Sequence, residues 1–199
     1  NSPFWSSISH DKDWTGRYYV QKMVLTTVDF TPTIGAKLTS WLSIGGGFII
    51  EYSGIYMNLA LNPTFAGQSD DGLGKYKYNN WGYGYLAGFL LKPTKRLRIG
   101  GTYRSKICHN YHLRSAFRPD NVSLDQEQHY NFPQSAVGSI HYQFNSCWAV
   151  MIDGGWENYQ NFNTRFVSTL DDSTVTTDRD WHDTYHVGIA VHCTPCPRF

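Results

Sequence analysis

Residues 81–92 read WGYGYLAGFLLK, and this stretch is the clearest sign of the fold. Its odd positions, from Trp81 to Leu91, carry only aromatic or aliphatic side chains, whereas three of its six even positions are glycine. Side chains two residues apart point to the same face of a strand, so a period of two is typical of β-structure. The stretch therefore predicts a β-strand with one strongly apolar face.

The same alternation recurs along the 199-residue chain. Apolar side chains occupy most alternate positions in each stretch, and no helical period of 3.6 residues competes with this pattern. The sequence therefore predicts seven strands. Besides residues 81–92, they are residues 17–38, 42–53, 97–108, 136–144, 148–157 and 184–192.

The connections between these strands alternate between short and long. Tight turns are predicted at residues 39–41, 93–96 and 145–146. Long polar loops, rich in Gly, Asn and Asp, are predicted at residues 58–80, 115–134 and 158–183. Short turns on one side and long loops on the other are typical of bacterial outer-membrane barrels, whose short turns are periplasmic.

Aromatic residues make up 16% of the chain, and several tryptophans stand near predicted strand ends. Rings at strand ends form girdles at the membrane–water interfaces of transmembrane barrels. A water-soluble β-sandwich also alternates, but charged side chains such as Arg104 and Asp153 on the less apolar face suit the wet interior of a barrel better. The sequence therefore predicts an all-β fold, an antiparallel transmembrane β-barrel.

Other protein classes are disfavoured by what the sequence lacks. No apolar run reaches the ~18–20 residues of a membrane helix, and the net charge of +1 gives no basic surface for nucleic acid. No Ser/His/Asp constellation is recognisable, and His109 and His112, the closest histidine pair, would point to opposite faces of a strand. The sequence thus predicts no enzyme activity, no cofactor and no metal site.

Several stretches of the chain share their residues, order and spacing with one family of membrane proteins. They are residues 14–20 (WTGRYYV), 80–85 (NWGYGY), 101–107 (GTYRSKI), 148–151 (WAVM) and 181–188 (WHDTYHVG). In these stretches, and in their order over nearly the whole chain, the sequence resembles the FadL-type outer-membrane transporters of long-chain fatty acids and related hydrophobic compounds.

The resemblance implies a monomeric, fourteen-stranded barrel in the bacterial outer membrane. Such a barrel takes up a long-chain fatty acid or other lipophilic ligand passively through an N-terminal hatch, contacts outer-membrane lipid and lipopolysaccharide, and binds no nucleic acid. The chain shows no segment like the family's hatch with its Asn-Pro-Ala motif, and it departs from the family pattern after Val191. Residues 1–199 are therefore expected to form a single partial barrel domain, with about seven strands and without the hatch and the C-terminal strands.

An apolar segment within the first long connection is the first candidate ligand site. Its apolar side chains are unusual for an extracellular loop, and an exposed apolar patch usually marks a binding surface. The segment predicts a landing groove for acyl chains; the alternative is that it packs under neighbouring loops. The residues concerned are Ile55, Met57, Leu59, Leu61 and Phe65.

Basic side chains are the second candidate, because a carboxylate head group needs a cation inside the barrel. The candidate ligands of the head group are Arg104, Arg179 and His182. The alternative is that such cations pair with lumen acids such as Glu51 or are solvated. A different alternative concerns the whole protein: an outer-membrane barrel with a structural or adhesive surface role and no transport.

Overall fold

A computed structural model describes residues 5–62, 71–117, 122–162, 164–168, 174–177 and 180–194. These residues form antiparallel strands and one short 3-10 helix, η1 (Tyr159–Asn161). No helix in this part of the chain is long and apolar enough to cross a membrane. The strands are β1 (Trp5–Ser9), β2 (Lys22–Phe30), β3 (Thr33–Lys37), β4 (Leu42–Leu61), β5 (Gly72–Leu91), β6 (Leu97–Arg104), β7 (Ile107–Phe117), β8 (Val122–Phe132), β9 (Ser135–Gln143), β10 (Trp148–Glu157), β11 (Thr164–Ser168), β12 (Thr174–Thr177) and β13 (Thr184–Cys193).

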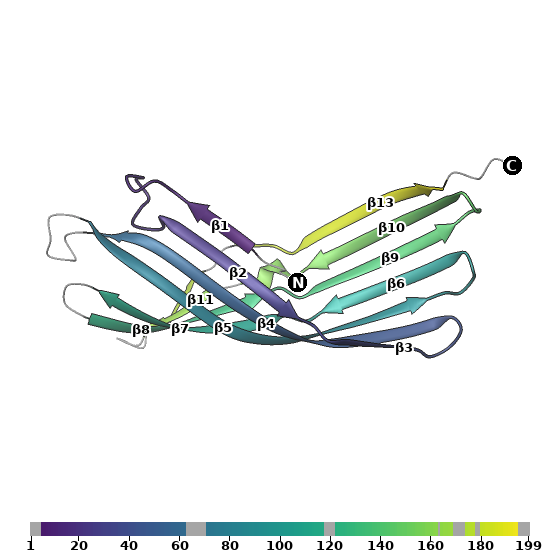
Figure 1. Ribbon diagram of the computed structural model, residues 1–199, viewed down its shortest axis with the longest axis horizontal. Helices are drawn as coiled ribbons and strands as arrows, with labels where there is room; N and C mark the ends of the chain where they lie inside the picture. Colours follow the sequence, from purple (N-terminus) through teal and green to yellow (C-terminus); the bar gives the residue numbers. More distant parts are fainter. Residues whose placement is uncertain are drawn as a thin grey trace.

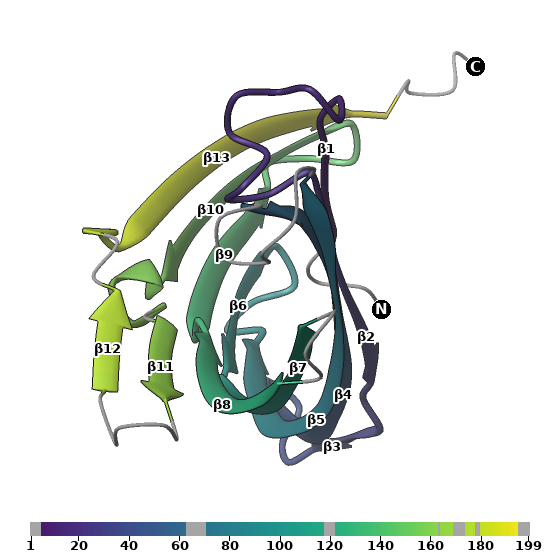
Figure 2. The same cartoon turned by 90° about the vertical axis from the view of Figure 1, so that its left-hand side faces the viewer.

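Two sheets contain these strands (Figure 1). The larger has the order β1-β2-β4-β5-β6-β9-β10-β13, with β3 paired beside β4, and the smaller has the order β12-β11-β8-β7. The larger sheet curves into an open trough whose edges are β1 and β13 (Figure 2). The fold is thus an incomplete antiparallel β-barrel, and the prediction of its class is confirmed.

The tight turns gather at one end of the trough and the long connections at the other (Figure 1). β4 and β5 show the geometry best, because they stay paired over all twenty residues, from Leu42 opposite Leu91 to Leu61 opposite Gly72. We call the two ends the turn side and the loop side. The predicted alternation of short and long connections is confirmed.

All seven predicted strands contribute to the larger sheet, with several differences at their ends. Residues 17–21 precede β2, and the predicted strand 97–108 was wrong at its end, because β6 ends at Arg104 and residues 107–108 belong to β7 of the smaller sheet. Residues 17–38 divide into β2 and β3 at Pro32, which has no N–H to donate to a neighbouring strand. The predicted first loop, residues 58–80, was wrong at both ends, because β4 continues to Leu61 and β5 begins at Gly72.

The other two predicted loops, residues 115–134 and 158–183, were wrong in a different way, because they contain strands of the smaller sheet. β7 pairs with β8, and β11 pairs with both β8 and β12. Polar residues occupy both alternations of β8, so its sequence lacks the one-sided apolar pattern on which the strand predictions relied.

The wall of the trough is interrupted at one level on three strands. β6 ends before Ser105, β9 begins after Gln134, and β10 ends before Asn158. Backbone pairing bridges two of these breaks, because the Asn158 N–H donates to the Gln134 carbonyl at 3.0 Å and the Ser105 N–H donates to the Tyr85 carbonyl at 2.9 Å.

A belt of side-chain hydrogen bonds follows these breaks. The Tyr103 hydroxyl donates to Gln134 Oε1 at 2.7 Å, and Gln134 Nε2 donates to Asn158 Oδ1 at 3.5 Å. Asn158 Nδ2 and the Trp156 indole N–H both donate to the carboxylate of Asp183, each at 2.8 Å. The Trp156 hydrogen bond is the main cause of a lowered pKa of Asp183. The belt therefore joins β6, β9 and β10 to the start of β13.

Beyond the break, β7 lies against the inner face of β5. This close approach requires glycine at two positions, because a Cβ on Gly82 would clash with Ile107 and His109, and a Cβ on Gly84 would lie 2.8 Å from Ser105 Oγ. Two apolar clusters form at this contact. One comprises Ile49, Ile107, Phe132 and Phe162, and the other comprises Ile55, Tyr78 and Tyr111.

The apolar face of the larger sheet changes sides along β2, β4 and β5. On the turn side of the row formed by Val28, Tyr52 and Trp81, apolar side chains point outward and are exposed; Trp81 is 56% exposed. On the loop side of this row, lysines point outward, whereas Ile55 and Tyr78 are buried inside. We call these two parts the turn-side half and the loop-side half, and the smaller sheet belongs to the second.

Candidate functional site

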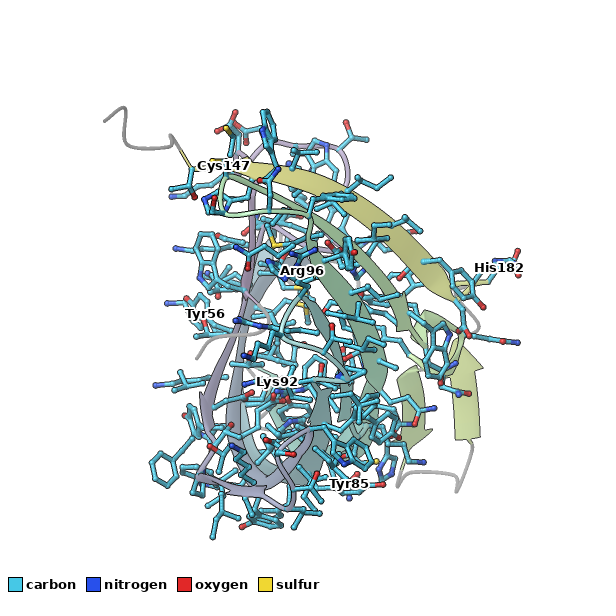
Figure 3. All side chains as sticks on the ribbon, turned by 90° about the vertical axis from the view of Figure 1, so that its right-hand side faces the viewer. Tyr56, Tyr85, Lys92, Arg96, Cys147 and His182 are labelled. Carbon is cyan, nitrogen blue, oxygen red and sulfur yellow. The ribbon has the colours of Figure 1, made fainter. Side chains whose placement is uncertain are left out.

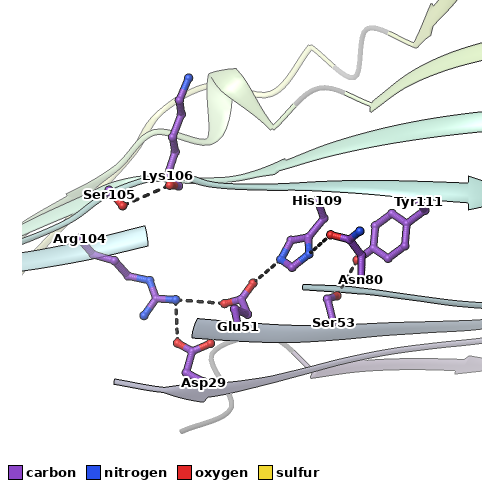
Figure 4. A network of polar contacts seen from close by, with 9 residues as sticks. All are labelled: Asp29, Glu51, Ser53, Asn80, Arg104, Ser105, Lys106, His109 and Tyr111. Atoms are coloured by element: carbon purple, nitrogen blue, oxygen red, sulfur yellow. Dashed lines mark hydrogen bonds and ion pairs between the residues drawn. The ribbon is translucent and has the colours of Figure 1, made fainter. Parts of the chain in front are cut away.

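A buried polar network lies where the two halves meet (Figure 4). Asp29 of β2 and Glu51 of β4 are directly paired across the two strands, and both are buried. Arg104, the last residue of β6, reaches both with one nitrogen: Nη2 lies 2.7 Å from Asp29 Oδ2 and 3.1 Å from Glu51 Oε2. The guanidinium thus compensates two carboxylates that would otherwise repel each other inside the protein.

His109 of β7 extends the network from the second sheet. Its Nε2 lies 2.8 Å from Glu51 Oε1, and its Nδ1 lies 3.3 Å from Asn80 Oδ1. Asn80 Nδ2 donates to the Asn110 carbonyl at 2.7 Å, which orients the amide oxygen toward His109. Both ring nitrogens therefore face oxygen atoms, so each side of the ring makes a polar contact. The network ties β7 to the wall of the trough.

An aromatic row continues from this network along the inner side of the loop-side half. Ring centroids of Tyr111 and Tyr130 are 5.6 Å apart, those of Tyr130 and Phe162 are 6.3 Å apart, and Phe162 stacks on Trp181 at 5.0 Å. The Tyr111 hydroxyl donates to Ser53 Oγ at 2.6 Å, and burial raises the pKa of Tyr111 to about 12. Tyr111 and Phe162 are buried within this row, whereas Trp181 at its end is 42% exposed.

The predicted apolar ligand residues lie on a strand. Ile55, Met57 and Leu59 are inward-facing positions of β4; Ile55 is buried against Tyr78 and Tyr111, and the other two are half-buried. Leu61 is the last residue of β4, and Phe65 lies outside the described residues. Their placement in an extracellular loop was wrong for the first four, because these lie in β4, where Ile55, Met57 and Leu59 continue the alternation with the apolar side turned inward.

Of the predicted basic residues, the structure describes Arg104 and His182 and places them at different sites. Arg104 is engaged by Asp29 and Glu51, so the alternative that it pairs with lumen acids is confirmed. His182 is exposed near the start of β13, at the far edge of the sheet (Figure 3), and lines a cavity of about 370 Å³ with Tyr159, Trp181 and others. Arg179 lies outside the described residues.

Sequence reasoning missed Asp29, His109 and Asn80 as members of the network. The available signal was the alternation along β2: Asp29 places an acid on the same inward face as Leu25 and Thr27. The network compensates the buried charges of Asp29 and Glu51 and holds β7 against the wall. In the described part of the chain, no group of three His, Cys, Asp or Glu side chains is placed to hold a metal ion.

A separate apolar groove of about 1060 Å³ lies on the outward face of β6, β9 and β10. Its floor is a row of glycines in register, Gly101, Gly138 and Gly154, and exposed Ile140 and Ile152 form part of its wall. It shares its face with the exposed rings of the turn-side half and does not communicate with the polar network.

The sequence matches a known protein family over nearly its whole length. The sequence model of the family described as outer membrane protein transport protein (OMPP1/FadL/TodX) matches residues 1–194. The chain belongs to this family. The resemblance inferred from the strand motifs is thereby confirmed. No curated protein matches the chain.

Solved structures of the OMPP1/FadL/TodX family share the fold. A Pseudomonas aeruginosa FadL homologue is 19% identical with a TM-score of 0.75, and the match covers 96% of this chain and 51% of that one. The Pseudomonas putida toluene transporter TodX is 16% identical with a TM-score of 0.65, and the match covers 99% of this chain and 60% of that one. The Ralstonia pickettii toluene transporter TbuX is 17% identical with a TM-score of 0.61, and the match covers 85% of this chain and 52% of that one. The chain thus spans 51–60% of the length of these structures.

Proposed function

We propose that this chain forms part of the wall of a monomeric channel in the bacterial outer membrane, which takes up hydrophobic compounds by diffusion. Long-chain fatty acids are the first ligand class, and outer-membrane lipid and lipopolysaccharide surround the barrel. The protein acts without catalysis. Membership of the OMPP1/FadL/TodX family supports the transport of hydrophobic compounds.

The dimensions of the turn-side half support its place in the membrane. Ten residues separate Trp81 from Leu91 on the outward face of β5. At about 3.3 Å per residue and a strand tilt of roughly 40°, they span about 25 Å, the height of the apolar band of outer-membrane barrels. The loop-side half then lies outside the membrane, where it meets the ligand first.

The single observation that carries the proposal is the inward turn of the apolar face in the loop-side half. There the inner side of β4 carries the half-buried Met57 and Leu59, next to Ile55, which is packed against Tyr78 and Tyr111. Because Arg104 is neutralised by two acids, this surface binds the hydrophobic part of a ligand, and a carboxylate head group is held by another cation. Arg179 and His182 remain the proposed cations.

Small aromatic hydrocarbons are a second candidate ligand class. Trp181, the exposed ring at the end of the aromatic row, suits a flat aromatic ligand, since aromatic rings attract one another in stacked and edge-to-face geometries. Two of the similar structures are toluene transporters. The two ligand classes differ in one respect that is measurable, the need for a cation.

The test compares Leu59→Gln with Leu73→Gln in the full-length protein in detergent. Leu59 faces inward on β4, whereas Leu73 faces outward on the adjacent part of β5 and is 54% exposed. We expect Leu59→Gln alone to weaken binding of a labelled long-chain fatty acid or of toluene, by about tenfold for one lost apolar contact. A well-folded wild-type barrel that binds neither ligand would overturn the proposal and favour a structural or adhesive role.

A further inference from the structure

We propose that the outward face of the loop-side half carries a binding surface for the phosphate groups of lipopolysaccharide, built by Lys22, Lys75 and Lys77. The proposal rests on the placement of the chain in the outer membrane. It deepens that placement by naming the residues with which the barrel contacts one lipid of the outer leaflet.

The three lysines come from two strands on either side of β4. Lys22 and Lys75 lie opposite Asn58 in one row across β2, β4 and β5, and Lys77 lies opposite Tyr56 in the next row but one. At roughly 4.8 Å between strands and 3.3 Å per residue, their Cα atoms lie about 7–12 Å apart. All three side chains are exposed, and Figure 3 shows Tyr56 projecting from the outer side of the same curved face.

The charges of this surface are free for a ligand. None of the three lysines makes an ion pair with any residue that the structure describes. Asp71, the acid that precedes β5, is engaged by Arg17 Nε at 2.6 Å and by the Tyr18 hydroxyl at 2.9 Å. A net positive surface therefore remains beside the neutral groups Asn58, Asn79 and Tyr56.

The height of the lysines fits the phosphate layer of the outer leaflet. Trp81 closes the exposed apolar band on β5, and Lys77 follows four residues farther toward the loop side. With the same rise and tilt, Lys77 lies about 10 Å beyond the band, and Lys22 and Lys75 lie about 15 Å beyond it. Lipopolysaccharide has its acyl chains in the band and its phosphates directly above them, so one molecule meets both the exposed rings and the lysines.

The opposite rim of the sheet provides a matched control. Lys92, Lys95 and Arg96 form an equally basic group around the turn between β5 and β6, which Figure 3 shows from the turn side with Lys92 and Arg96 labelled. This rim faces the periplasm in the proposed orientation, where the leaflet contains no lipopolysaccharide. Both groups contain three cations, so replacing either one changes the net charge equally.

The experiment measures binding of purified lipopolysaccharide to the full-length protein in detergent at low salt. Each basic residue near an anionic lipid surface contributes about fivefold to the binding constant. We therefore expect the triple variant Lys22→Gln, Lys75→Gln and Lys77→Gln to bind on the order of 100-fold more weakly. The triple variant Lys92→Gln, Lys95→Gln and Arg96→Gln should bind as the wild type does.

Three outcomes would overturn the proposal: wild-type affinity in the first variant, equal losses in both variants, or equal affinity of the wild type for dephosphorylated lipopolysaccharide or phosphatidylglycerol vesicles. Fatty acid binding by the same preparations is measured in parallel. A barrel that binds fatty acid but not lipopolysaccharide would contradict the proposed lysine surface and leave the proposed function standing. A barrel that binds lipopolysaccharide but not fatty acid would contradict the proposed function and leave the lysine surface standing.

Discussion

The turn-side and loop-side halves are built from the same strands but place their apolar side chains on opposite faces. On β4, Phe48 and Ile50 point outward in the first half, whereas Ile55 is buried inside in the second. A strand surrounded by lipid must be apolar outside, and a strand surrounded by water must be apolar inside. In the proposed orientation, the apolar face changes sides near Tyr52 and Trp81 because the surroundings of the continuous strands change there from lipid to water.

Removing the arginine at the junction of the two halves should have the largest effect. Arg104→Met leaves Asp29 and Glu51 buried without their cation, and breaking a buried charge network in this way costs about 3–5 kcal/mol of unfolding free energy. Arg98→Met, on the same face of β6 and exposed, should cost less than about 0.5 kcal/mol. Denaturant unfolding in detergent, followed by tryptophan fluorescence, compares the two; equal losses would contradict the role of the network.

A charge placed on the outward face separates the two halves directly. Phe48→Arg puts a cation in the apolar band, where it should cost about 2–4 kcal/mol, whereas Tyr56→Arg on the same strand lies beyond the band and should cost about 0–1 kcal/mol. Unfolding of both variants in lipid bilayers measures the difference. A similar cost for both would mean that the switch in apolar face does not mark the membrane boundary.

The contact of β7 with the wall should depend on glycine. In Gly82→Ala the added methyl group meets Ile107 and His109, so β7 has to shift, at about 1–3 kcal/mol. Gly54→Ala is the control, because the nearest atom to its Cβ would be 3.8 Å away. Limited proteolysis of the β7–β8 hairpin reports the displacement, and unchanged protection of that hairpin in Gly82→Ala would contradict the packing.

The smallest effect should come from an exposed contact at the far end of the loop-side half. Arg17 donates a hydrogen bond to Asp71 and lowers the pKa of the Asp71 carboxyl. Asp71 also accepts a hydrogen bond from the Tyr18 hydroxyl, which raises the pKa of Tyr18. The contribution of Asp71 is present above its unfolded pKa of about 3.9 and is lost as the pH falls through its lowered value. The contribution of Tyr18 is present below about pH 10 and is lost as the pH rises through its raised value.

Protease accessibility of residues 10–21, measured from acid to alkaline pH, tests this contact. The wild type should be protected over the neutral range and lose protection at both extremes. Asp71→Asn should abolish the acid-side change, because the amide does not titrate. A wild-type profile in that variant would show that other groups control the segment.

The sequence was sufficient for the turn-side half and insufficient for the loop-side half. Strands such as residues 81–92 and 148–157 could be predicted because lipid demands one apolar face, which appears directly as a period of two. The alternation continues beyond Trp81 with its sign reversed, as Tyr76 and Tyr78 face inward while Lys75 and Lys77 face outward. A prediction that requires apolar side chains at the outward positions therefore stops at Trp81 and misses the part of the strand in the loop-side half.

The polar network could not be predicted for a different reason. Its members Asp29, Glu51, Arg104 and His109 are brought together by pairing of β2 with β4 and by the fold of β7 over β5, and no local pattern records either contact. The prediction that an inner arginine pairs with an acid such as Glu51 was confirmed, because an unpaired buried charge is costly wherever the strands meet.

The common break of three strands at Ser105, Gln134 and Asn158 has a consequence for the evolution of such barrels. Insertions or exchanges beyond it change the hairpins of the smaller sheet without shifting any strand register in the membrane, since the hydrogen-bond belt from Tyr103 to Asp183 closes the wall beneath them. Substitutions in the hairpins of the smaller sheet can therefore change the loop-side half while the pairing of β6, β9 and β10 on the turn side stays the same.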